Sequence, residues 1–214
     1  MVQIHQPAVA GQFYPADAET LTAIVEGFLD SASTRADRPV QAVIVPHAGY
    51  VFSGAVAAEA YAGISPAAVY ERIFIIGPGH REAFRGAAVD GSSEVYSMPL
   101  GDVSVDTRTC LELAAADSVF HNRRKPFEKE HCLEVQIPFL QVRLKRMPPI
   151  VPVIISSVDG NDLGRIVRVL KPYFTQENLF VISSDFSHYP SYDDACKVDR
   201  ATGDAILSGS VEEF

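Results

Sequence analysis

Three of the six histidines each follow a short apolar segment of the sequence. His47 lies in the segment PHAGY, His80 ends the segment GPGH, and His188 ends the segment SSDFSH. If the apolar segments are parallel strands, their carboxyl ends meet at one edge of a sheet, where open α/β sheets bind their ligands. We therefore expect the three imidazoles to lie in one cleft. Imidazole is a common ligand of transition metals, so this pattern predicts a metal site that keeps positions open for substrate or oxygen.

Asp185 precedes His188 by three residues and is a candidate for acid–base chemistry with it. A carboxylate beside an imidazole orients the ring or tunes its basicity. The alternative is that Asp185 caps the following turn, because aspartate favours such positions whatever the function.

Two common enzyme classes are disfavoured. A hydrolase triad of Ser183, Asp185 and His188 lacks the GxSxG motif, and three residues of one loop do not readily align in series. The motif GPGH is not the GxGxxG of dinucleotide-binding folds, and the acidic residue expected on the second strand of such a fold is missing. Nicotinamide chemistry is therefore not indicated.

A further pair of candidate residues, His131 and Glu134, is spaced i, i+3. The sequence predicts a helix from about residue 129 to 145 around them, with Pro138 as a kink or a break. On that helix the two side chains would share a face, where they could support metal ligands or bind a metal themselves. The alternative is an ordinary surface pair of histidine and glutamate.

Short runs of Val, Ile, Leu and Phe, nearly continuous rather than alternating, predict strands that are buried on both faces. The expected strands are residues 42–45, 73–76, 150–155 and 179–182. One expected helix follows Asp17, and a second covers about 54–62 with Ser53 as its cap. A third begins at Asp106, and another runs through 163–170. Residues 86–105 are expected to form an antiparallel excursion or a lid. The pattern predicts an α/β fold, a three-layer α/β/α sandwich with a largely parallel central sheet.

The composition favours a single domain over residues 1–214. Hydrophobic residues make up 47% of the chain and charged residues 21%, which is ordinary for a globular protein. The net charge of -9 would repel a phosphate backbone, so nucleic acid is excluded as a partner. The apolar runs are far shorter than the roughly 20 residues that span a bilayer, and the start does not resemble a signal peptide. We expect a cytoplasmic protein without membrane contact.

The three cysteines are Cys110, Cys132 and Cys196, an odd number without CxxC spacing. Neither a disulfide framework nor a zinc site made of cysteines is indicated. We expect three buried thiols.

Six motifs occur in order along the whole chain: PAVAGQFYP, VPHAGYVFSG, IIGPGH, EHCLEVQIPFL, VPVII and SSDFSHY. Together they resemble the Memo-like family, whose bacterial and archaeal members are called AmmeMemoRadiSam system protein B. That family is similar in fold to the class III extradiol ring-cleaving dioxygenases. The resemblance implies an α/β sandwich with a metal at the strand ends.

The resemblance also implies roles for the histidines. His47 of PHAGY and His80 of GPGH would be the two imidazole ligands of the metal. His188 of SSDFSH would match the acid–base histidine of the dioxygenases, with Asp185 beside it.

Two further motifs of the family concern the same cleft. His131 and Glu134 match the family's E-H-x-x-E helix and would line the cleft. Family members continue into a segment with a Cys-Gly motif, whose cysteine supplies a third metal ligand. The present sequence ends at Phe214, and none of its cysteines lies in such a motif. We therefore expect a truncated sequence that lacks the C-terminal segment of the family.

Two functions fit these observations. The first is a Memo-like metal-binding protein, a non-heme iron or copper enzyme of redox or dioxygenase type with an unknown substrate; zinc is the alternative metal. The second is a non-catalytic module that binds a peptide or a phosphorylated ligand in the same cleft, through glycine loops and helix N-termini. The expected partner is a small molecule or a peptide.

Overall fold

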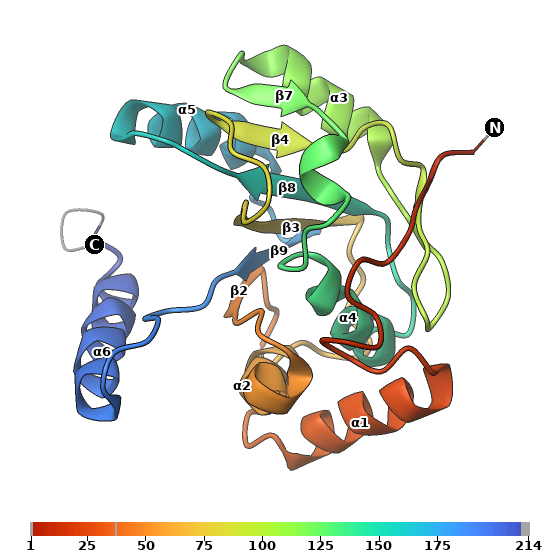
Figure 1. Ribbon diagram of the computed structural model, residues 1–214, viewed down its shortest axis with the longest axis vertical. Helices are drawn as coiled ribbons and strands as arrows, with labels where there is room; N and C mark the ends of the chain where they lie inside the picture. The colour runs from red at the N-terminus through yellow and green to blue at the C-terminus, as the bar shows by residue number, and fades with distance from the viewer. Residues whose placement is uncertain (1, 37, 211–214) are drawn as a thin grey trace. The chain divides into compact units, whose positions relative to one another are not determined.

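The computed structural model describes residues 2–36 and 38–210 (Figure 1). The chain divides into two compact units, residues 1–184 and residues 185–214. The first unit contains both β-sheets and most of the helices, and residues 185–210 of the second contain one helix. The single domain expected for residues 1–214 stays a prediction.

Six strands of the described residues form the main sheet of the first unit. In spatial order they are β2 (Ala42–Val45), β9 (Asn178–Ser183), β3 (Arg72–Pro78), β8 (Ile150–Ile155), β4 (Ala87–Val89) and β7 (Phe120–Asn122). The first four strands are parallel to one another, and β4 is antiparallel to β8 but parallel to β7. The four predicted strands are confirmed as β2, β3, β8 and β9.

Helices cover both faces of this sheet (Figure 1). The interior strands β3, β8 and β9 are almost continuously buried, whereas the edge strand β2 alternates between exposed and buried residues. One layer consists of α1 (Ala18–Ser31), α2 (Tyr50–Ala62) and α4 (Ile137–Arg143), which pack against one another. The other consists of α3 (Thr107–Ala116) and α5 (Gly160–Leu170), and η3 (Lys171–Tyr173) extends α5. The predicted three-layer α/β/α sandwich is confirmed. No helix within the described residues has the length and apolar character needed to cross a membrane.

The predicted helix starts are confirmed where an aspartate caps them. The Asp17 carboxylate accepts a hydrogen bond from the backbone N–H of Thr20 at the start of α1, and Asp106 starts α3 in the same way. The Ser53 cap is wrong, because α2 begins at Tyr50. The N–H of Tyr50 donates to the carbonyl of Phe13 at 2.8 Å, so a distant segment satisfies this helix start.

The prediction for residues 86–105 is partly wrong. Strand β4 belongs to the main sheet and is fully buried. Besides β4, which is antiparallel to β8, the antiparallel part is β5 (Val95–Tyr96) with β6 (Val103–Ser104), and β5 joins β1 (Ile4–His5) in a small separate sheet. Strand β4 is only three residues long, AAV, so it lacks the run of large apolar residues from which the other strands were predicted.

The helix predicted for about residues 129–145, with Pro138 as a kink or a break, is confirmed only over α4. The segment contains two 3₁₀ turns, η1 (Lys125–Phe127) and η2 (Glu134–Gln136), before α4 begins at Ile137. Pro138 lies in the first turn of α4. Backbone N–H groups in the first turn have no intrahelical acceptor, so a proline, which lacks the N–H, costs no hydrogen bond there. His131 and Glu134 therefore do not share a helix face.

The second unit contains α6 (Tyr192–Ser208). The Ser191 side chain caps its start by accepting from the N–H of Asp194, and Gly209 ends it with a φ of 69°. Glycine adopts this left-handed conformation without a steric penalty, so it is a common residue at a helix end.

One exposed carboxylate on α2 fixes the loop that follows α1. Glu59 accepts hydrogen bonds from the N–H and the hydroxyl of both Ser33 and Thr34, at 2.9 to 3.1 Å. The backbone bonds from Ser33 and Thr34 are the main cause that lowers the pKa of Glu59 from 4.5 to about 2. The ionised form thus stabilises the fold above the unfolded pKa, and this contribution is lost as the pH falls through the folded pKa.

We expect Glu59→Gln to lower the melting temperature at about pH 7, because the amide accepts these bonds more weakly than a carboxylate. The difference from the wild type should shrink as the pH falls from about 4.5 toward 2. Thermal unfolding followed by circular dichroism over this pH range measures the difference. Glu26→Gln on the exposed side of α1 is the matched control. A difference that does not change with pH would contradict the role of the charge.

Candidate metal centre

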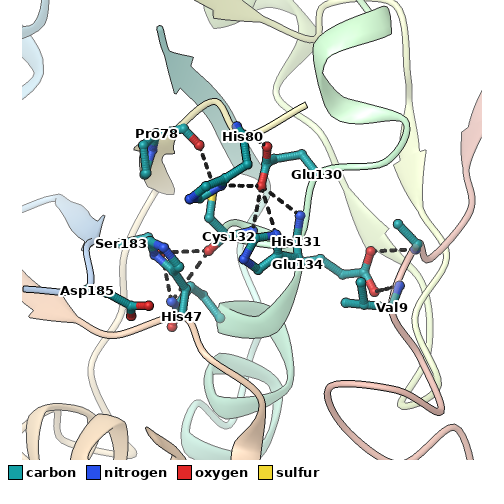
Figure 2. Close-up of polar contacts among 12 residues, drawn as sticks. Val9, His47, Pro78, His80, Glu130, His131, Cys132, Glu134, Ser183 and Asp185 are labelled. Carbon is teal, nitrogen blue, oxygen red and sulfur yellow. Dashed lines mark hydrogen bonds and ion pairs between the residues drawn. The ribbon is translucent and has the colours of Figure 1, made fainter. Parts of the chain in front are cut away.

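Three histidine rings converge in the first unit (Figure 2). His47 follows β2, His80 follows β3, and His131 lies in the turn between η1 and η2. The ring centroids are 5.2 Å apart for His47 and His80, 5.5 Å for His47 and His131, and 4.6 Å for His80 and His131. One ring nitrogen of each residue lies within 4.8 Å of the others. This arrangement offers three nitrogen donors to one metal ion.

The sequence predicted that His47 and His80 would meet, and the structure places their rings together. Their role as metal ligands stays a prediction. His131 was expected to lie near the ligands on a regular helix, but it reaches the same cluster from an irregular turn. Gly77 in β3 permits this approach, since a Cβ at that position would lie 2.7 Å from the Cys132 sulfur.

Sequence reasoning missed Glu130, whose buried carboxylate organises the turn before η2. Its Oε2 accepts the backbone N–H of His80 at 2.7 Å. Its Oε1 lies 2.8 Å from Nδ1 of His80 and accepts the N–H of His131 at 2.9 Å and of Cys132 at 3.2 Å. Burial alone would raise the pKa of Glu130, but the hydrogen bonds from His131, His80 and Cys132 hold it well below its usual range. The only signal in the sequence was the glutamate directly before His131.

A second network contacts the ring of His47. Its Nδ1 lies 2.9 Å from the hydroxyl oxygen of Ser183, the last residue of β9. The Ser183 hydroxyl donates to the carbonyl of Cys132 at 2.6 Å and accepts from Nε2 of Gln136 at 2.9 Å. All of these side chains are buried, so their polar atoms are satisfied by one another rather than by solvent.

Glu134 does not face the three rings. Figure 2 shows its carboxylate directed toward Val9. It accepts the N–H of Ala8 at 2.6 Å, the N–H of Val9 at 3.0 Å and the hydroxyl of Tyr14 at 2.6 Å. Burial raises the pKa of Glu134, although these three bonds act in the opposite direction. Its contacts tie the N-terminal segment to η2.

This N-terminal segment reaches the candidate metal centre through Phe13. The Phe13 ring lies 4.8 Å from the ring of His131, measured between centroids. The carbonyl of Phe13 also accepts the N–H that begins α2. Residues before α1 thus form part of the surroundings of His131.

Asp185 and His188, the predicted acid–base pair, belong to the second unit. Nε2 of His188 lies 3.8 Å from Oδ2 of Asp185, and Nδ1 of His188 lies 2.9 Å from the carbonyl of Phe186. The His188 side chain is 55% exposed. The two residues are close enough for a charge interaction if the imidazole is protonated, and their role in proton transfer stays a prediction.

The cysteines are free, as expected, but not all are buried. Cys110 and Cys132 are buried, whereas Cys196 is exposed on α6, so that part of the prediction is wrong. The Cys132 sulfur lies within 4.8 Å of ligand atoms of His80 and Glu130. Its thiol donates to the carbonyl of Pro78 at 3.1 Å. Burial raises the pKa of the Cys132 thiol, which favours the protonated form that does not bind metals.

Comparison with known proteins identifies relatives along almost the whole chain. A family model described as Memo-like protein matches residues 5–214. A MEMO1 family protein of Methanosarcina acetivorans is 36% identical over 211 residues, which cover 96% of this chain and 75% of the relative. Protein MEMO1 of Xenopus laevis is 34% identical over 84% of this chain and 61% of its own length. The memo-1 homolog of Caenorhabditis elegans is 38% identical, over 84% of this chain and 51% of its own length.

We expect Glu134→Ala to destabilise the fold by about 2–5 kcal/mol, because it leaves three donors, two of them buried, without their acceptor. Urea unfolding measures the loss, and hydrogen exchange should show faster exchange at Ala8 and Val9. Glu134→Gln retains one acceptor oxygen and should lose less. Unchanged exchange at both amides in the alanine variant would show that Glu134 does not fix the N-terminal segment.

Proposed function

Because the chain belongs to the Memo-like protein family, we propose that His47, His80 and His131 bind one iron or copper ion for redox chemistry of dioxygenase type. The observation that carries the proposal is the approach of three ring nitrogens to within 4.8 Å of one another. Three imidazoles from separate parts of the chain that meet in one place form a candidate metal site by donor type and geometry.

The donor set fits these metals. Imidazole nitrogen is a ligand that suits iron, copper and zinc, whereas calcium and magnesium prefer oxygen. Three protein ligands leave coordination positions for a substrate, as catalytic sites do. A bound iron or copper ion would supply one-electron redox chemistry, which the side chains of the cluster do not supply by themselves.

The residues around the cluster keep the three rings in place. Glu130 bonds to the ring of His80 and to the backbone of His131, and Ser183 contacts the ring of His47. The ring of Phe13 packs beside the ring of His131. Such contacts orient ligands before a metal binds, so that less ordering is required on binding.

The proposal gives the second unit a separate role in proton transfer. His188 would carry the proton, and Asp185 would orient its ring through the contact at 3.8 Å. The His188 side chain is 55% exposed, so it can exchange protons with solvent, which suits this role.

We expect metal-free protein to take up about one iron or copper ion per chain. The protein is incubated with Fe²⁺ without oxygen or with Cu²⁺, then dialysed and submitted to elemental analysis. His47→Ala combined with His80→Ala should abolish uptake, and His131→Ala should weaken it. His121→Ala, at a ring outside the cluster, is the control. Equal metal content in all variants would overturn the site, and uptake of zinc alone would overturn the redox chemistry.

We expect His188→Ala to retain the metal content of the wild type, because the proposal makes this residue a proton carrier and not a ligand. The same elemental analysis measures it, with His131→Ala prepared in parallel. A loss of metal as large as that caused by His131→Ala would contradict the assigned role.

A further inference from the structure

We propose that Glu130 and Ser183 are positioning residues, each of which accepts a hydrogen bond from Nδ1–H of one imidazole, so that Nε2 is the unprotonated nitrogen when that ring is neutral. The rings are those of His80 and His47, respectively. This inference rests on the proposed metal site, because only an unprotonated ring nitrogen binds a metal. It goes further in naming the tautomer of both rings and the groups that determine it.

For His80, the argument depends on the surroundings of the Glu130 carboxylate. Both oxygens face N–H groups of the backbone, one from His80 at 2.7 Å and others from His131 and Cys132 at 2.9 and 3.2 Å. A proton on either oxygen would point at another proton, so the carboxylate acts as an acceptor. The ring nitrogen that lies 2.8 Å from Oε1 must then be the donor, and Nδ1 of His80 carries the proton.

For His47, the tautomer follows from the hydrogens around one hydroxyl group. Ser183 has a single hydroxyl proton, and the carbonyl of Cys132 receives it at 2.6 Å, since a carbonyl only accepts. The hydroxyl oxygen therefore accepts from its other partners. One of these is Nε2 of Gln136 at 2.9 Å, and the other is Nδ1 of His47 at 2.9 Å. Nδ1 of His47 is thus a donor.

The orientation of the Gln136 amide is itself determined. Its Nε2 lies 3.0 Å from the carbonyl of Pro46, and its Oε1 accepts from the hydroxyl of Tyr61 at 2.9 Å. Turning the amide over would place two oxygens against each other at Pro46. The direction of the bond from Gln136 to Ser183 is therefore fixed, and it leaves the hydroxyl proton to the Cys132 carbonyl.

His121 provides a contrast within the same chain. Its Nε2 lies 3.0 Å from the carbonyl of Arg85, which only accepts, so this ring carries its proton on Nε2. His121 should therefore show the opposite tautomer to His47 and His80. Nδ1 of His131 lies 3.1 Å from Oε1 of Glu130 but without hydrogen-bond geometry, so no tautomer is assigned to that ring.

The first test uses metal-free protein labelled with ¹⁵N at histidine, at about pH 8, where an ordinary imidazole with a pKa of about 6.5 is neutral. Long-range ¹H–¹⁵N correlation spectra distinguish protonated from unprotonated ring nitrogens. We expect protonated Nδ1 and unprotonated Nε2 for His47 and His80, and the reverse for His121. A mixture of tautomers, or protonated Nε2, at either site histidine overturns the inference.

The second test compares two variants with one control. Glu130→Gln and Ser183→Ala should each give a mixture of tautomers at the ring concerned, and each should weaken Zn²⁺ binding roughly 10- to 100-fold. Zn²⁺ serves as a probe because it does not change oxidation state. His121→Ala, at a ring outside the cluster, should stay within about twofold of the wild type.

The outcomes separate this inference from the proposed function. Weaker Zn²⁺ binding in Glu130→Gln without a change of tautomer would make Glu130 a ligand and overturn its positioning role. Absence of metal binding in the wild type would overturn the proposed function, while the tautomers of the metal-free protein would still test the positioning of both rings. If either variant fails to fold, the wild-type spectrum alone decides.

Discussion

The candidate metal centre depends on the hydrogen bonds that the buried carboxylate of Glu130 accepts. This carboxylate joins the end of β3 to the turn before η2, because it bonds to the backbone and the ring of His80 as well as to the N–H groups of His131 and Cys132. A charged group buried to this extent is stable only when several donors surround it. The same bonds that offset the cost of its burial therefore fix the spacing of two of the three rings.

The sheet supplies the remaining part of the geometry. Strand β9 lies between β2 and β3, and its Ser183 pairs in register with Val45, the last residue of β2. Three neighbouring parallel strands thus end beside one another and deliver His47, Ser183 and His80 to one edge. This edge is where open α/β sheets bind ligands, and here it also supplies the hydroxyl that contacts the ring of His47.

The sequence predicted the strands and two of the rings because these follow from strong local patterns. Continuous apolar runs mark β3 and β8, and the histidines that follow β2 and β3 could be placed at strand ends. The irregular segment before α4 could not be predicted, since it is shaped by bonds from Glu130 to backbone groups and has no periodic pattern. The sequence therefore placed His131 on a helix, although the helix begins only after it. The direction of the Glu134 side chain depends on its bonds to a segment more than a hundred residues away, which the local sequence does not reveal.

The position of β9 has a consequence for the order in which the protein is made. It is the last of the described strands along the chain, yet it occupies the interior of the sheet between β2 and β3. During synthesis, β2 has no neighbouring strand until β9 emerges, and the facing edge of β3 stays open. A nascent polypeptide on the ribosome accordingly lacks Ser183, and with it the contact to the ring of His47, until β9 has been synthesised and inserted between β2 and β3.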